Sequence, residues 1–177
     1  MKYAIKLSVF LGIVALISTV ALAAVNSVTA PIIEEYQNAR FTEAVEGAFP
    51  ESTGFTRIAN DQDLNHNYLM EVLEIFGDDG TIGFIYSKVV PGFGGPITYV
   101  MGLSSEGDFV SFDVLSHSET PGFGARVVDE PDWSNRLLSK NIDDQVDILT
   151  GASNTTRALI GGIAAMREDF NSYRRIG

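Results

Sequence analysis

No charged residue occurs between Leu7 and Ile33, and residues 7–25 are almost wholly apolar. A helix of about 20 apolar residues is long enough to cross the roughly 30 Å hydrocarbon core of a bilayer. We therefore predict a transmembrane helix within an N-terminal anchor, residues 1–33. A buried helix of a water-soluble domain is not expected to be this long and this uniformly apolar.

The charges beside this segment predict its orientation. Lys2 and Lys6 precede it, whereas acidic residues follow it from Glu34 onward. Because basic residues are enriched on the cytoplasmic side, we expect the N-terminus in the cytoplasm and residues 34–177 outside the cytoplasmic membrane. Ala21-Leu22-Ala23 also resembles the cleavage site of a secretory signal. A single retained anchor is favoured, since the apolar run is longer than a usual signal core.

The composition excludes several functions. The chain has 12 Lys+Arg against 23 Asp+Glu, and its net charge of −11 argues against nucleic-acid binding, which requires a basic surface. It contains no cysteine, so it cannot by itself form a disulfide, a cysteine-ligated zinc site or an iron–sulfur cluster. A redox function would therefore need an organic cofactor.

Residues 34–177 are predicted to form one α+β domain with a mostly antiparallel sheet and packed helices. Thr29-Ala30-Pro31 is expected to end the span, and an amphipathic helix with apolar residues from Phe41 to Phe49 should follow it. Two hairpins should supply four strands, and two helices should follow them. The expected strands are 68–76, 81–90, 97–103 and 109–115, and the expected helices are 131–139 and 155–173.

A short repeat follows two of the expected strands. Pro91-Gly92-Phe93-Gly94 recurs as Pro121-Gly122-Phe123-Gly124. The glycines allow a ligand to approach the backbone, and each Phe could cover an aromatic ring. Since Pro-Gly is primarily a turn signal, the favoured interpretation is two similar turns with buried Phe side chains.

Common catalytic and metal-binding motifs do not occur. The sequence has no nucleophile elbow, Walker loop, dinucleotide-binding glycine motif or zinc-protease helix. Asp61-x-Asp63-x-Asn65 resembles a calcium loop only briefly, because His66 stands at the turn glycine and Val72 at the final glutamate. His66 and His117 are therefore interpreted as structural or exposed residues.

The segment from Asp147 to Arg157 combines hydroxyl groups with small residues. Four hydroxyl residues, Thr150, Ser153, Thr155 and Thr156, accompany small residues at the start of the last expected helix. Backbone N–H groups and the helix dipole make such a terminus a favourable phosphate site. The residue pattern alone favours simple helix capping by Ser153 or Thr155. Asn154-Thr155-Thr156 is also a glycosylation sequon, but that pattern is too short to decide anything.

A family resemblance favours a phosphate site over simple helix capping in this segment. Thr150-Gly151-Ala152-Ser153-Asn154-Thr155 resembles the Ser/Thr-Gly-Ala-Thr/Ser-x-Thr signature of the FMN-binding domain in the Rnf complex G subunit and in the C subunit of the sodium-pumping NADH:quinone reductase. Two further segments, Gly94-Gly95-Pro96-Ile97 and residues 117–124, are similar to family motifs in the same order, and Trp133 falls where the family often has Trp. Thr150, Ser153 and Phe123 are mild departures. The short chain favours the Rnf protein.

The resemblance implies that Thr155 carries FMN through a phosphodiester bond. Gly151 and Ala152 would let the phosphate and ribityl chain approach the backbone, and Thr150, Ser153 and Thr156 would donate hydrogen bonds to them. One side of the flavin ring is expected at the loop from Glu119 to Gly124, where Thr120, Pro121 and Gly122 would present backbone N–H and C=O groups to its polar edge. Glu119 has an alternative role as a structural acceptor for a backbone loop.

The function implied is a membrane-anchored flavoprotein subunit that relays electrons within an Rnf-type ferredoxin:NAD oxidoreductase, coupled to sodium or proton translocation. Its expected partners are the other membrane subunits, a flavin transferase and membrane lipid. The chain alone shows no NAD motif and no charged residue inside its span, so it should not complete the reaction. The alternatives are the quinone-reductase subunit, a stand-alone extracytoplasmic FMN protein, and a non-redox envelope protein.

Overall fold

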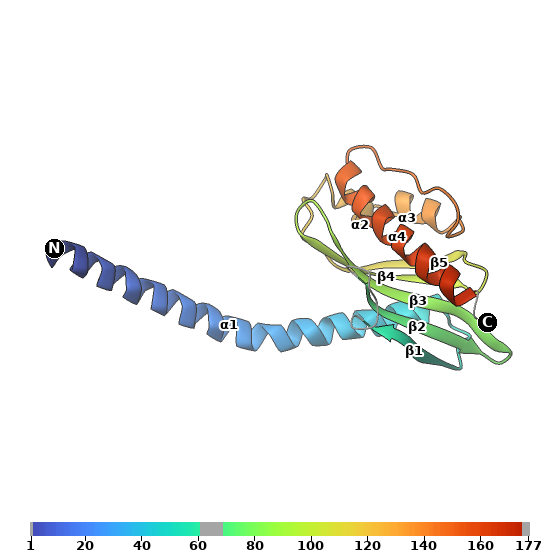
Figure 1. The fold of residues 1–177 in the computed structure, drawn as a ribbon, viewed down its shortest axis with the longest axis horizontal. Coiled ribbons are helices and arrows are strands. Elements are labelled where there is room, and N and C mark those ends of the chain that lie inside the picture. Colours follow the sequence, from blue (N-terminus) through green and yellow to red (C-terminus); the bar gives the residue numbers. More distant parts are fainter. Residues whose placement is uncertain (1, 61–68, 175–177) are drawn as a thin grey trace. The chain divides into compact units, whose positions relative to one another are not determined.

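The computed structural model describes residues 2–60 and 69–174 (Figure 1). The segment from Asp61 to His66, with its resemblance to a calcium loop, lies outside the described residues. The chain divides into two compact units, residues 1–39 and 40–177. The first contains only helix; the second contains the sheet and the remaining helices, so the fold is α+β as expected.

Helix α1 runs from Lys2 to Ala48 and contains Pro31. The expectation that the first helical segment ends at Thr29-Ala30-Pro31 is wrong: the apolar segment and the amphipathic segment are one helix. Proline removes one backbone hydrogen bond, and the strong helix formers that follow it continue the helix to Ala48. Within the described residues, Ile5–Ala48 is the one helix long and apolar enough to cross a membrane, by length and composition. Large apolar side chains such as Leu11 and Leu22 are exposed along it.

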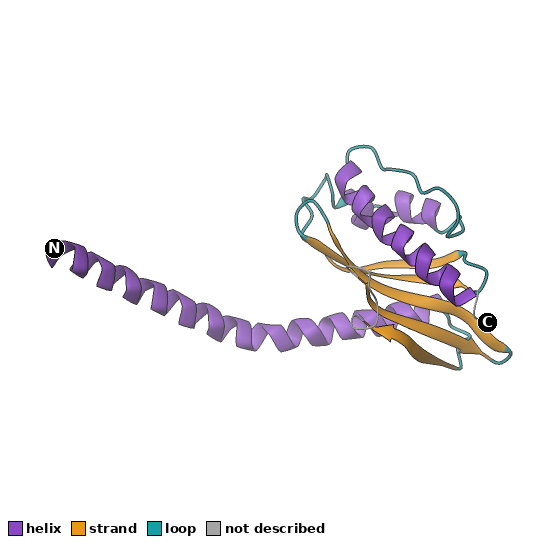
Figure 2. Ribbon diagram, viewed as in Figure 1, coloured by secondary structure: helices purple, strands orange, loops and turns teal. Residues whose placement is uncertain are grey.

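Within the described residues, five strands form one antiparallel sheet in the order β1-β2-β3-β4-β5. Figure 2 shows this sheet in orange. The four expected strands are present, and the turn at Asp78-Asp79 joins β2 to β3 as predicted. Strand β1 was not predicted, because it is an edge strand with few apolar residues whose Phe55 is exposed. The strands are β1 Gly54–Asn60, β2 Leu69–Gly77, β3 Gly80–Pro91, β4 Pro96–Ser104 and β5 Phe109–Ser116.

In the part of the chain that the structure describes, three helices follow the sheet: α2 Arg126–Asp129, α3 Pro131–Leu137 and α4 Ser153–Arg174. The two expected helices correspond to α3 and α4, whereas the single turn of α2 was not predicted. Proline begins α3, because a first helical residue needs no N–H donor. On α4, the apolar positions expected to share a face are buried or half-buried against the core: Ala158, Leu159, Ile163, Met166 and Phe170.

Helices cover both faces of the sheet. On one face, α4 and α3 pack against alternate residues of β3 and β4, including Tyr86, Tyr99 and Met101. On the other, the end of α1 packs through Val45 and Phe49 against the intervening residues. Side chains alternate between the faces of a strand, so consecutive apolar residues are buried on opposite sides. The domain therefore has two apolar cores separated by the sheet.

Candidate functional site

A cavity of about 450 Å³ opens between the β3–β4 connection, the segment after β5 and the start of α4. Small-ligand sites have volumes of about 300–1,000 Å³, so the cavity is large enough for a cofactor. The β3–β4 connection and the first residues of α4 lie at the same end of the sheet (Figure 1). The residues lining the cavity are Phe93, Thr120, Phe123, Gly124, Gly151, Ala152, Ser153, Asn154 and Thr155.

The two Pro-Gly-Phe-Gly segments meet at this cavity. Phe93 is 74% exposed and Phe123 is 66% exposed, and both line the cavity. The favoured expectation of two turns with buried Phe side chains is therefore wrong. The repeat instead presents two exposed aromatic rings at one site.

Glu119 connects three parts of the site. One carboxylate oxygen accepts a hydrogen bond from the Gly94 N–H at 3.0 Å, and the other accepts one from the Thr155 hydroxyl at 2.7 Å. Both Glu119 and Thr155 are buried. The hydrogen bond from the Gly94 N–H corresponds to the alternative role expected for Glu119, a structural acceptor for a backbone loop. Because α4 begins at Ser153, Thr155 lies inside the helix rather than at its N-cap position, and the interpretation of Thr155 as a helix cap is not supported.

Glycines leave the space that the Glu119 carboxylate occupies. A Cβ at Gly92 would overlap one carboxylate oxygen, and a Cβ at Gly124 would overlap the other. A Cβ at Gly124 would also lie 2.7 Å from the Thr155 hydroxyl oxygen. One glycine of each repeat, Gly92 and Gly124, is therefore required for the position of the Glu119 carboxylate beside Thr155, a reason that the sequence pattern did not reveal.

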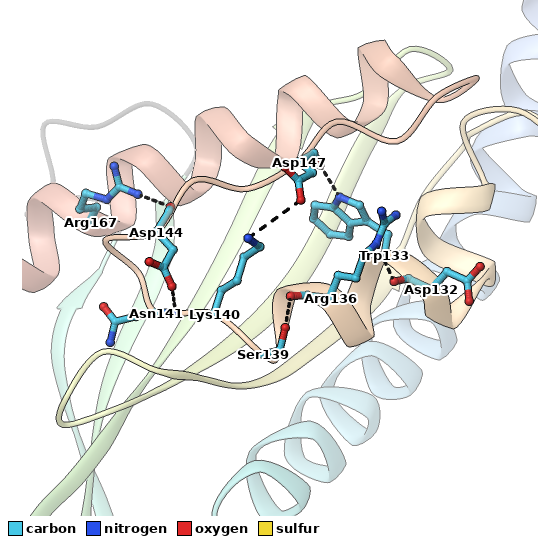
Figure 3. Close-up of polar contacts among 9 residues, drawn as sticks. All are labelled: Asp132, Trp133, Arg136, Ser139, Lys140, Asn141, Asp144, Asp147 and Arg167. Carbon is cyan, nitrogen blue, oxygen red and sulfur yellow. Dashed lines mark hydrogen bonds and ion pairs between the residues drawn. The ribbon is translucent and has the colours of Figure 1, made fainter.

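The irregular segment before α4 is fixed by polar contacts (Figure 3). The Trp133 indole N–H donates to the Asp147 carbonyl at 2.9 Å, and Arg167 donates to the carbonyl oxygens of Ile142 and Asp144. Lys140 forms an ion pair with Asp147 at 4.0 Å. These contacts hold the chain that leads into the hydroxyl-rich segment and so position the start of α4.

The structure brings some of the predicted site residues together and separates others. Five of them line the cavity: Thr120, Gly151, Ala152, Ser153 and Thr155. Glu119 lies directly behind them, in contact with Thr155. Four others are not among the residues that line the cavity: Pro121, Gly122, Thr150 and Thr156. The Thr156 hydroxyl instead donates to the Ala152 carbonyl at 2.9 Å, inside the helix.

Arg126 places a cation beside this loop and was not predicted. Its guanidinium donates to the Thr150 carbonyl at 3.5 Å, and a Cβ at Gly151 would lie 3.3 Å from it. Hydrogen bonds to Glu130 raise the pKa of Arg126 and lower that of Glu130, so both remain charged. Its place in the sequence, two residues after the second repeat, gave no signal, because the loop that it contacts is 24 residues away.

A second group of polar residues is buried between α4 and the sheet. The Lys88 ammonium donates to the Gly162 carbonyl at 2.9 Å, and burial lowers the pKa of Lys88 to about 8, although Asp169 opposes this effect. The buried hydroxyls of Tyr86 and Tyr99 have no hydrogen-bond partner among the described residues. Burial raises the pKa of both tyrosines.

A comparison with known protein families gives a match in the part of the chain that forms this site. Residues 92–168 match the model of the FMN-binding domain, and every residue lining the cavity falls within this range. This segment is similar to FMN-binding domains. The resemblance found in the sequence motifs is thereby confirmed.

Three relatives extend the similarity over most of the chain. It is 23% identical to the G subunit of the ion-translocating oxidoreductase complex of Shewanella piezotolerans, over 98% of this chain and 92% of the relative. It is 24% identical to the G subunit of the Na(+)-translocating ferredoxin:NAD(+) oxidoreductase complex of Acetobacterium woodii, over 90% and 83%. It is 22% identical to the G subunit of the proton-translocating ferredoxin:NAD(+) oxidoreductase complex of Clostridium ljungdahlii, over 92% and 89%.

The lining of the cavity fits FMN, the ligand named for the matched domain. Apolar rings at Phe93 and Phe123 suit a planar aromatic group, whereas the hydroxyls and small residues at the start of α4 suit a phosphate and a sugar alcohol chain. Gly151, with a φ of 91°, lets the backbone turn sharply where a phosphate would approach. Arg126 adds a positive charge beside the same loop.

Proposed function

We propose that this protein is the membrane-anchored flavoprotein subunit of an Rnf-type ion-translocating ferredoxin:NAD oxidoreductase, in which it relays electrons through FMN. The similarity to G subunits over nearly the whole chain supports the assignment to the complex. The single observation that supports FMN as the cofactor is the cavity within residues 92–168. This cavity has an apolar aromatic end and a hydroxyl-rich end at a helix N-terminus.

We propose further that FMN is attached to Thr155 through its phosphate. Thr155 lines the cavity at the helix N-terminus, where backbone N–H groups and the helix dipole favour an anionic phosphate. A covalent tether fixes the effective concentration of the flavin and prevents its loss. The bound flavin would supply the ability to accept and return electrons, which no side chain of this cysteine-free chain provides.

The chain's own residues then have distinct tasks. Gly151, Ala152 and Ser153 would surround the phosphate, and Arg126 would offset part of its charge. Ester formation would join the Thr155 oxygen to the FMN phosphorus as the flavin donor's bond from that phosphorus to its leaving group breaks. The Thr155 hydroxyl hydrogen leaves as a proton, so the present hydrogen bond to Glu119 cannot persist unchanged. Glu119 would keep its hydrogen bond from the Gly94 N–H and so hold the β3–β4 connection against the segment after β5.

The proposal includes the placement of the chain. Residues 1–33 would anchor it in the cytoplasmic membrane by a single span, with the N-terminus in the cytoplasm and residues 34–177 outside. The other membrane subunits would supply NAD chemistry and the ion path. A flavin transferase would attach the FMN on the extracytoplasmic side.

The intact mass of the denatured full-length protein, produced together with its flavin transferase, tests the attachment. We expect an excess of one FMN less one water in the parent protein and in Thr150→Ala, and no excess in Thr155→Ala. Thr150 is the matched control, because it is an exposed threonine of the same motif that does not line the cavity. An excess that persists in Thr155→Ala, or that is missing from the parent protein, would refute the attachment site.

The absence of native cysteine permits a direct test of orientation. Asp79→Cys places one thiol in the exposed β2–β3 turn, and Lys2→Cys places one at the N-terminus. In intact cells a membrane-impermeant maleimide should label only the first variant. The reverse labelling pattern would refute the orientation. An intact mass that lacks the first 23 residues would show that the N-terminal segment is a cleaved signal rather than an anchor.

A further inference from the structure

The hydrogen bond between Thr155 and Glu119 joins a hydroxyl that lines the cavity to a carboxylate behind it. The Thr155 hydroxyl oxygen lies 2.7 Å from the Glu119 carboxylate, and the exposed fractions of the two residues are 1% and 6%. Thr155 lines the cavity, whereas Glu119 is not among the lining residues. A molecule in the cavity therefore meets Thr155 rather than Glu119, while the Thr155 hydroxyl donates its hydrogen to the carboxylate.

The other hydroxyls of the same segment have different surroundings. Thr156 donates to the Ala152 carbonyl at 2.9 Å, inside the helix, and Thr150 is exposed and does not line the cavity. Ser153 lines the cavity, but in the part of the chain that the structure describes it donates to no carboxylate. Among these four described hydroxyls, Thr155 alone both lines the cavity and donates to a carboxylate.

Backbone groups hold the Glu119 carboxylate in place. Its second oxygen accepts a hydrogen bond from the Gly94 N–H at 3.0 Å, and the Glu119 N–H donates to Nδ1 of His117 at 3.2 Å. Gly92 and Gly124 leave the space that the two carboxylate oxygens occupy. An activated hydroxyl in an enzyme has a base about 2.6–3.2 Å away and a third group that orients this base. The contacts of Glu119 have this arrangement.

Attachment of FMN requires both an activated hydroxyl and an activated phosphate. A threonine hydroxyl is a weak nucleophile until a base takes its proton. Condensation of the hydroxyl with free FMN would release water, which is unfavourable in aqueous solution, so the donor must be an anhydride of FMN with a second phosphate. In protein kinases, a carboxylate accepts the proton of the hydroxyl that attacks a phosphoric anhydride.

We propose that Glu119 is the general base for the attachment of FMN to Thr155, so that the acceptor protein supplies a catalytic residue for its own modification. This inference rests on the proposed function. The Thr155 oxygen forms a bond to the FMN phosphorus, the bond from that phosphorus to the anhydride oxygen breaks, and the leaving phosphate keeps the electron pair. The proton of the Thr155 hydroxyl passes to the Glu119 carboxylate and from there to solvent.

The rate of attachment tests this role in the full-length, flavin-free protein. The protein is mixed with its flavin transferase and with flavin adenine dinucleotide, which is an anhydride of FMN, and intact mass follows the attached flavin over time. Glu119→Gln keeps an oxygen that accepts from the Gly94 N–H but cannot take a proton. Glu119→Asp keeps a carboxylate, and Glu106→Ala, in an exposed turn, is the control. Circular dichroism and unfolding midpoints establish that each variant is folded at the assay temperature.

Glu119→Gln should slow attachment by about 10²–10⁴-fold, which is the contribution of a general base. Glu119→Asp should be slowed less, and Glu106→Ala should match the parent protein. The ratio of the parent rate to the Glu119→Gln rate should fall as the pH is lowered, because protonation of Glu119 removes the base from the parent protein alone.

A second control separates Glu119 from the titratable groups connected to it. His117 accepts the hydrogen bond from the Glu119 N–H, and its Nε2 lies 3.9 Å from the Asp129 carboxylate. His117→Asn removes the titrating ring but keeps an oxygen that can accept from the same N–H. The pH dependence of the parent protein should persist in His117→Asn and vanish in Glu119→Gln.

Four results would overturn the proposal. Attachment to Glu119→Gln at the parent rate at every pH would show that the base lies elsewhere, and the flavin attached to the parent protein would leave the proposed function intact. Slow attachment to both Glu119→Gln and Glu119→Asp, with a ratio to the parent rate that does not depend on pH, would show that the carboxylate only shapes the site. A pH dependence that vanishes in His117→Asn would assign it to the histidine. A parent protein that gains no flavin would refute the proposed function and this inference together.

Discussion

The two faces of the sheet differ in what they bury. The face covered by the end of α1 is packed by an apolar cluster that includes Val45, Phe49 and Ile85. Beside the face covered by α4 lie the three charged residues that are buried among the described residues, Lys88, Glu119 and Asp169. Buried charges need partners and cost stability, whereas apolar packing requires only a good fit between side chains.

This difference indicates that the two faces have different functions. The α1 face stabilises the domain, and the α4 face accommodates polar groups around the cofactor cavity. Glycines serve opposite purposes on the two faces. Gly83 gives room to the ring of Phe49, so that a helix packs closely on an apolar sheet, whereas Gly124 gives room to the Glu119 carboxylate, so that a charge reaches Thr155. The following predictions test whether the two faces respond differently.

The largest effect is expected on the α1 face. Phe49→Ala removes a buried ring that packs directly against Gly83, and it should lower the free energy of unfolding by about 3–5 kcal/mol. The single tryptophan, Trp133, is buried on the other face and reports unfolding by its fluorescence. Phe55→Ala, which truncates an exposed ring, is the control. The amount of attached flavin should be unchanged in the folded variant. A selective loss of flavin would contradict the separate functions of the two faces.

The second effect is a pH dependence that comes only from the α4 face. Burial lowers the pKa of Lys88 to about 8 from its ordinary 10.5, so between these values the unfolded chain binds more protons. Stability should therefore rise with pH between 8 and 10, by about 2–3 kcal/mol, and be independent of this group below pH 8. Above pH 10 the raised pKa values of Tyr86 and Tyr99 reverse the trend, because tyrosines of the unfolded chain ionise first.

Unfolding midpoints measured at pH 7.5, 9 and 10 test this prediction. The rise should vanish in Lys88→Met and persist in Lys140→Met, which removes a lysine from the loop before α4. A rise of unchanged size in Lys88→Met would show that other groups cause it.

A third prediction concerns the hydrogen bonds of Glu119. Glu119→Ala leaves the Gly94 N–H and the Thr155 hydroxyl without their acceptor, and it should cost about 1–3 kcal/mol. Glu119→Gln should cost less, because the amide oxygen still accepts from Gly94 and the amide N–H can donate to the Thr155 oxygen. Thermal unfolding of the flavin-free protein measures both, with Glu106→Ala in an exposed turn as the control. Equal losses for Ala and Gln would contradict the hydrogen-bond explanation.

The sequence predicted those parts of the fold that local patterns determine. Runs of β-branched and aromatic residues on either side of turn segments such as Asp78-Asp79 identified β2 to β5, and the spacing from Leu159 to Phe170 identified α4. Strand β1 was missed, because an edge strand depends on its neighbour rather than on its own composition. The length of α1 was missed, because Pro31 predicts an end although the residues after it favour helix.

Predictions about the site failed where they required long-range contacts. The motif from Thr150 to Thr155 identified one end of the cavity, and the repeat was visible in the sequence. No local pattern showed that Phe93 and Phe123 face one cavity, or that Arg126 lies beside Thr150. These contacts arise from the packing of α4 and the β3–β4 connection at one end of the sheet.

The smallest effect comes from two neighbouring glycines on α4. Gly161 is exposed with no atom near its missing Cβ, so Gly161→Ala should stabilise the protein by about 0.5–1 kcal/mol through helix propensity alone. At Gly162 a Cβ would overlap the Tyr99 hydroxyl and lie 3.0 Å from Val90, so Gly162→Ala should destabilise despite the same propensity gain. Unfolding midpoints of the two variants compare them directly. Opposite signs would show that α4 sits on the sheet at a distance set by Gly162, and stabilisation by both would show that this face repacks easily.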